Sequence, residues 1–248
     1  MRRVIIADIR RIVFRIWPWI FLAVAFAVIA GSFAYSINDA VDREFFYLTE
    51  VSGQTLATLV IGFVLILGIF GDEFKSMAMI GIIGRGLNRD KFVLAKFFDE
   101  IILGIMFLTI TAVFAVAIAL GFNIKLSSTE VSFMMLSFLM EFLELIAYLT
   151  ISAMFFFLSE NVAMGVFAFL SFEFIIPVAL YFASMLAVVQ RYHLDSYYVS
   201  GLLGRAFSDF IMGDILEGVI VILITIIAYI GLPLFVTMFY FRKKEMEF

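Results

Sequence analysis

The sequence predicts an all-α integral membrane protein: a single domain with an N-terminal amphipathic interfacial helix and six transmembrane helices. Of the 248 residues, 65% are hydrophobic and only 15% are charged, and the mean hydropathy is +1.13. Soluble domains contain roughly 45–50% apolar residues, so a water-soluble fold could not bury this much apolar surface. A bilayer span needs about 20 mainly apolar residues, and several stretches of the chain meet that length.

Residues 1–16 have the pattern of an amphipathic helix. Val4, Ile9 and Ile12 recur at helical spacing, and arginines occupy many of the remaining positions. Basic amphipathic helices of this kind lie in the membrane interface. The apolar run that follows is too long for a secretory signal peptide. We therefore expect residues 1–16 to be retained as an interfacial helix.

Six apolar stretches predict the transmembrane helices. They are residues 17–37, 52–70, 97–122, 130–158, 162–189 and 215–241. Trp17 and Trp19 open the first span, where an interfacial aromatic belt is expected. Pro177 interrupts the fifth span. The segment 190–214 before the last span is longer and more polar, and it contains the only histidine, His193.

The distribution of lysine and arginine predicts that both termini face the cytoplasm. With that orientation, thirteen of the 17 basic residues lie on the inner side and four lie in the outer loops. Loops that carry an excess of lysine and arginine stay in the cytoplasm during insertion. We therefore expect a multi-pass protein of the cell membrane.

The segment 71–96, between the second and third predicted spans, has an unusual composition. Its motifs are Glu73-Phe74-Lys75, Gly84-Arg85-Gly86 and Arg89-Asp90-Lys91, and Lys96 ends it. Its eight charged residues exclude a lipid-facing helix, so the segment must lie in water or at the interface. On charge alone, a solvated loop that only enforces topology is preferred to a docking surface.

The same segment resembles the first cytoplasmic loop of ABC-2 type transporter permeases, the membrane subunits of bacterial ABC exporters. In that family an acidic and aromatic start, a turn with glycine and arginine, and a following lysine recur at this spacing. The resemblance needs no gap across residues 73–96. Met77 and Ala78 differ from the glycine-threonine pair that the family usually has. The six-span plan and the aromatic-basic end at residues 240–244 agree with the resemblance.

The resemblance implies a bacterial permease that pairs with a second permease copy or paralogue and docks a separate ABC ATPase subunit. In the family this loop forms a short coupling helix that sits in a cleft of the ATPase. The coupling residues implied here are Glu73, Phe74, Lys75, Arg85, Gly86, Arg89, Lys91 and Lys96. ATP and magnesium belong to the partner, and no cofactor is expected in this chain. The implied activity is export of a hydrophobic or amphipathic cargo, with antimicrobial peptides as the first expectation.

The residues exclude several other classes of function. A phosphate-binding loop needs Gly-x-x-x-x-Gly-Lys-Ser/Thr, and here the glycine cluster is followed by Leu87-Asn88. One histidine and no cysteine cannot assemble an intramembrane metalloprotease or a zinc site. A nucleic-acid binder would need a basic soluble domain. We expect a transport subunit that is not itself an enzyme.

Three acidic residues within the predicted spans are candidate pathway residues. Glu141 and Glu144 share a face of the fourth span, and Glu173 lies in the fifth. Acids within a membrane normally face a protein interior or a wet cavity. One alternative is that these acids are protonated and hydrogen-bonded between helices. For the protein as a whole, the alternatives to a transport subunit of an ABC exporter are an ATP-independent ion- or proton-coupled carrier or channel that uses these acids, and a membrane anchor for a partner enzyme.

Overall fold

The computed structural model describes residues 1–38, 43–71, 78–84, 86–121, 128–185 and 194–243. Every regular element in these ranges is a helix, which confirms the all-helical prediction. Four helical runs within them are long and apolar enough to cross a membrane: 89–118, 131–159, 162–183 and 215–243. The chain is therefore a multi-pass membrane protein.

The N-terminal part contains three helices, α1 (Arg2–Val13), α2 (Ile16–Asn38) and α3 (Arg43–Phe70). Helix α1 and residues 16–31 of α2 are bent by 61° relative to each other and, taken together, make one further candidate span among the described residues. The described side chains of α3 add the apolar stretch Ala57–Phe70. Each of the six predicted spans contains helix in its described part, and the number that crosses the membrane stays a prediction.

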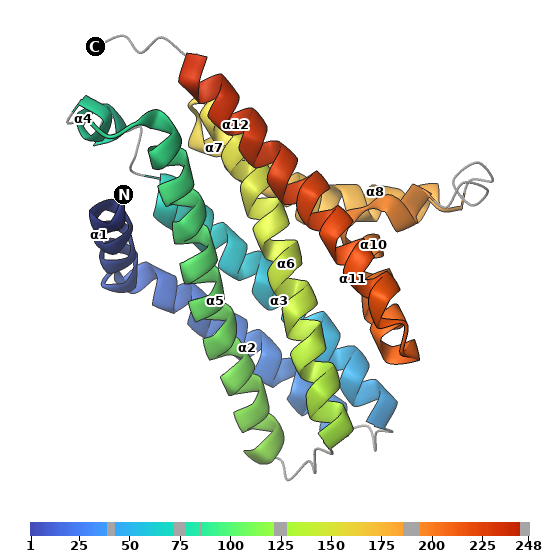
Figure 1. The fold of residues 1–248 in the computed structure, drawn as a ribbon. Coiled ribbons are helices and arrows are strands. Elements are labelled where there is room, and N and C mark those ends of the chain that lie inside the picture. The colour runs from blue at the N-terminus through green and yellow to red at the C-terminus, as the bar shows by residue number, and fades with distance from the viewer. Residues whose placement is uncertain (39–42, 72–77, 85, 122–127, 186–193, 244–248) are drawn as a thin grey trace.

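Helix α6 (Ser128–Ser159) lies at the centre of the bundle. It packs against α3, α5 (Arg89–Gly121), α7 (Val162–Leu170), α10 (Val199–Met212) and α12 (Leu232–Lys243). Residues 145–152 of α6 are all buried, because neighbours cover every side of these two turns. Figure 1 shows α5, α6 and the C-terminal run that ends in α12 as long rods that form the body of the molecule.

The last two predicted spans both contain a π-helical segment. In the fifth, η1 (Ser171–Ile175) joins α7 to α8 (Ile176–Ala183). In the sixth, η3 (Ile226–Gly231) joins α11 (Ile215–Thr225) to α12. Each π-helix ends two residues before a proline, Pro177 or Pro233. Proline lacks a backbone N–H and clashes with the carbonyl four residues earlier, and the wider π-turn accommodates both effects.

Both ends of the chain lie at the same end of the molecule. Helix α1, the short helix α4 (Ala78–Gly84) and the C-terminal end of α12 gather there (Figure 1). The turn at residues 159–161 connects α6 and α7, and the Asn161 side chain accepts a hydrogen bond from the Ala163 amide as an N-cap. The position of both chain ends at one end of the molecule agrees with an even number of membrane crossings.

The structure changes the expected role of the apolar stripe on α1. Ile12 is fully buried, and its side chain lies against Gly68 of α3. Ile9 and Val13 also pack on the main core cluster. We expected α1 to be an interfacial helix, but its apolar stripe packs on the bundle. Of the larger apolar side chains, Ile6 on α1 and Phe14 just after its end are exposed.

The contact between α3 and α7 gives a first stability prediction. A Cβ atom on Gly62 would lie 2.1 Å from Cζ of the fully buried Phe169, so Gly62→Ala forces the core to shift. We expect Gly62→Ala to lower the free energy of unfolding by about 1–3 kcal/mol. Gly31→Ala is the control, because a Cβ there meets nothing within 4 Å and alanine favours helix. Thermal unfolding in detergent measures both. Equal melting temperatures would contradict the close packing.

Candidate functional site

A cavity of about 360 Å³ lies between α6, the η1–α8 segment and α10. All three predicted pathway acids line it: Glu141 and Glu144 from α6, and Glu173 from η1. Met140, Leu203 and Phe207 supply apolar wall, and Ser137 and Ser200 supply hydroxyl groups. The tertiary structure therefore brings together acids from two helices that the sequence placed only on separate spans.

Two of these acids are held in place by neighbouring hydroxyl groups. The Tyr148 hydroxyl donates a hydrogen bond of 2.8 Å to Oε1 of Glu144, one turn away on α6. The Thr58 hydroxyl of α3 donates a bond of 3.1 Å to Oε2 of Glu141. A hydroxyl donor to a carboxylate forms one of the stronger classes of hydrogen bond. Sequence analysis missed Thr58 and Tyr148, because neither stands out in a span that is otherwise apolar.

Glu173 differs from the other two acids. Its Oε2 atom is buried and accepts no hydrogen bond from the described residues. Glu173 lies within the π-helix η1, and π-turns inside α-helices occur frequently at functional sites. An orphaned carboxylate oxygen next to a cavity has capacity left to bind a group that donates hydrogen bonds.

Hydrogen bonds from tyrosine hydroxyl groups join the π-helical segments to the start of α10. The Tyr198 hydroxyl donates to the carbonyl oxygen of Phe172 in η1. The Tyr229 hydroxyl of η3 donates a bond of 2.8 Å to the carbonyl oxygen of Tyr197. Both bonds hold the segment before α10, and α10 forms one wall of the cavity. The sequence contains the pair Tyr197-Tyr198 and the prolines Pro177 and Pro233. The sequence analysis did not connect these residues with one another.

The arrangement suits a positively charged group. The described lining contains three carboxyl groups and no lysine, arginine or histidine. Within the described residues, no group of three or more histidine or acidic side chains is placed to hold a metal ion. A cavity with apolar walls and a few convergent polar groups is the usual form of a small-molecule site, and 360 Å³ is at the small end of the range.

The segment resembling a coupling loop is only partly described. Glu73, Phe74, Lys75 and Arg85 lie outside the described residues. Gly86 has φ of +93°, a left-handed conformation that glycine adopts without strain. The short helix α4 precedes this turn.

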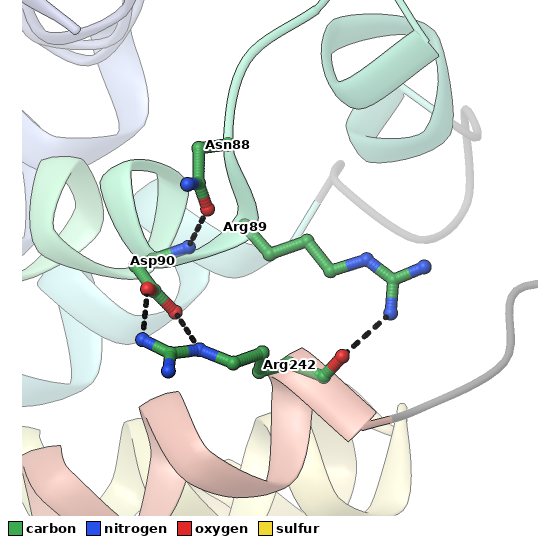
Figure 2. Close-up of polar contacts among 4 residues, drawn as sticks. All are labelled: Asn88, Arg89, Asp90 and Arg242. Atoms are coloured by element: carbon green, nitrogen blue, oxygen red, sulfur yellow. Dashed lines mark hydrogen bonds and ion pairs between the residues drawn. The ribbon is translucent and has the colours of Figure 1, made fainter.

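A cluster of polar contacts joins the start of α5 to the end of α12 (Figure 2). Asn88 caps α5, since its side chain accepts a hydrogen bond of 3.1 Å from the Asp90 amide. Arg242 makes a two-bond ion pair with Asp90. Arg89 donates bonds of 3.3 Å to the carbonyl oxygens of Phe241 and Arg242, which lie at the C-terminal end of α12. The predicted coupling residue Arg89 thus binds within the chain.

Lys96 requires a correction. The sequence placed it at the end of a loop in water, but α5 begins at Arg89 and Lys96 is only 1% exposed. Its ammonium group forms an ion pair of 2.8 Å with Asp8 of α1. A buried, paired lysine has no surface to offer a partner subunit, so Lys96 is not a docking residue. Lys91, in the first turn of α5, is exposed.

The sequence is not matched by any protein-family model or by any curated protein. The resemblance to ABC-2 type permeases therefore depends on the loop motifs and on the plan of the helices, and it remains a prediction.

Proposed function

We propose that the chain is the membrane subunit of an ATP-driven ABC-2 type exporter, which moves an amphipathic or hydrophobic cargo with positive charge out of the cell. The observation that carries this proposal is the cavity lined by Glu141, Glu144 and Glu173. Its carboxyl groups complement a cationic group, and its apolar wall complements the hydrophobic part of the same molecule.

The size of the cavity limits what it can hold. A volume of about 360 Å³ admits one side chain or one headgroup and not a folded peptide. A cationic antimicrobial peptide would therefore present one lysine or terminal amine at a time. A lipid with an amine headgroup has the same chemistry and is a second possible cargo.

The energy source in this proposal is a separate ABC ATPase bound at the segment 71–96. The short helix α4 and the glycine turn at Gly86 have the form that the resemblance implies for a coupling segment. The contacts of Arg89 and Asp90 with the end of α12 link this segment to the last predicted span. A displacement of the segment by an ATPase would therefore be passed directly to α12.

One observation favours an ATP-independent alternative. A buried carboxyl oxygen with no described donor, at Glu173, is also what a proton- or ion-coupled carrier or channel needs. In that function the three carboxyl groups would bind the coupling ion and no ATPase would be required.

A pull-down distinguishes these two functions. The tagged chain is purified from its native host in mild detergent, and co-purified proteins are searched for an ATPase with a phosphate-binding loop. We expect one ATPase per permease in the parent and at least about a tenfold loss in Lys91→Glu, because the reversed charge opposes docking. Arg2→Glu is the control, because Arg2, the first residue of α1, is also exposed and lies outside the segment.

The absence of any ATPase from the purified complex under several mild detergents would contradict the exporter proposal and move the ion-coupled carrier to first place. Equal recovery of the ATPase with Lys91→Glu and with the parent would contradict the assignment of ATPase docking to the segment 71–96.

A further inference from the structure

A second group of buried polar side chains lies between α1 and α5, away from the acid-lined cavity. Asp99 and Glu100 of α5 are 0% and 1% exposed, in a helix long and apolar enough to cross a membrane. Lys96 lies one turn before them on α5 and is paired with Asp8 of α1. Nothing in the proposed transport function uses this group.

The two cations of the cluster are both bound to Asp8. Lys96 Nζ lies 2.8 Å from Oδ2 of Asp8, and the guanidinium of Arg11 lies 3.1 Å from Oδ1. By contrast, none of the four carboxyl oxygens of Asp99 and Glu100 accepts a hydrogen bond from a described residue. An ionised carboxylate buried without such bonds is very costly, so the group binds a proton instead.

The arrangement of Asp8 and Asp99 supports the same conclusion. The ion pair with Lys96 places the Asp8 carboxyl group beside the turn of α5 that carries Asp99. When both are ionised they repel each other, and Asp99 competes with Asp8 for Lys96. A metal ion is a poor alternative, because the Lys96 ammonium already lies among the acids and repels a second cation.

Among the side chains that the structure describes, the other helices that pack on α5 bring no further charge close to the cluster. In α2 and α3 these described side chains are at residues 16–31 and 57–70, and none of them is ionisable. On α6 the described titratable side chains are Glu141, Glu144 and Tyr148, and they belong to the acid-lined cavity described above. On α12, Arg242 is paired with Asp90 at the far end of the helix.

We propose that Asp99 and Glu100 form a proton-binding site which α1 covers, so that α1 is docked on the bundle when the site holds its proton and is released when the proton leaves. Helix α1 covers this turn of α5 with Asp8. One turn later on α1, Ile12 is fully buried against α3. Arg11 also lines a surface hollow of about 700 Å³.

The sign of the pH dependence follows from this arrangement. A carboxyl group that must be neutral in the docked state stabilises docking at low pH, and this contribution is lost as rising pH ionises the group. The proton goes to water through the opened site. This inference does not depend on the exporter proposal, since it concerns only α1 and α5.

The absence of cysteine from the chain provides a direct test. Ile12→Cys places a thiol under α1, and Phe14→Cys places one at a position that is 80% exposed. The rate of labelling at position 12, divided by the rate at position 14, reports release of α1 and cancels the ionisation of the thiol. We expect this ratio to rise about tenfold between about pH 5 and about pH 9.

The control for the site is the double variant Asp99→Asn with Glu100→Gln in each cysteine background. The amides imitate protonated carboxyl groups, so we expect the labelling ratio to stay low at every pH. A ratio that does not change with pH in the parent overturns the proposal. So does an unchanged pH dependence in the double variant.

A second measurement covers the case in which Ile12→Cys does not fold. Hydrogen exchange of the α1 amides is measured in the cysteine-free parent and in the double variant, in lipid nanodiscs at each pH. We expect faster exchange in the parent than in the double variant at high pH and equal exchange at low pH. Equal exchange at every pH overturns the proposal.

Discussion

Lys96→Met is expected to lower the free energy of unfolding by about 3–5 kcal/mol, the cost of removing one partner from a buried ion pair. Methionine has a similar length and fits the buried space, so the loss comes from the charge. Among the described residues, Asp8 would then keep only Arg11 as a cationic partner, and the Arg11 side chain is 25% exposed. The ammonium also lies 5.4 Å from the centre of the Phe92 ring, a contact that methionine weakens.

The matched control is Lys91→Met, the same substitution on the same helix at an exposed position. We expect it to change stability by less than about 0.5 kcal/mol. Unfolding by heat or by a denaturing detergent measures both variants in the same lipid-like environment. Equal stability of Lys96→Met and Lys91→Met would show that the buried pair does not hold α1 in place.

Substitution of the cavity acids has the second large expected effect. Glu144→Gln together with Glu173→Gln removes two carboxylates and keeps their shape. We expect this variant to bind a cationic amphipathic peptide at least about tenfold more weakly, which corresponds to about 1.4 kcal/mol. A cation that enters a cavity with apolar walls loses its hydrating water, and the carboxylates replace the interactions that this water made.

The control for this effect is Glu217→Gln, an acid on α11 whose side chain is 65% exposed. Binding of a fluorescent peptide to protein in nanodiscs gives the affinity of all variants. A neutral analogue of the peptide should bind parent and variant equally. If the parent does not prefer the cationic peptide, or if the double variant binds it as the parent does, the acids are structural and the cavity is not the cargo site.

The positions of the helices were predictable from the sequence. The expected spans 97–122 and 130–158 correspond to α5 and α6, which begin within eight residues of the expected starts and end within a residue. Hydropathy over about 20 residues is a local property, and a helix in a membrane must satisfy its backbone within that stretch. The sequence also predicted that Glu141, Glu144 and Glu173 face a protein interior or a wet cavity, because an acid that faces lipid within a span is costly.

The tertiary structure decided how these residues are combined. The sequence placed Glu173 on a different helix from Glu144, and only the packing of η1 and α10 on α6 brings both to one cavity. Likewise, Lys96 was assigned to a loop because the segment 71–96 carries eight charges, too many for a lipid-facing helix. Its partner Asp8 lies 88 positions earlier in the chain. A charge can be buried when a second charge meets it there, and folding rather than local sequence supplies that second charge.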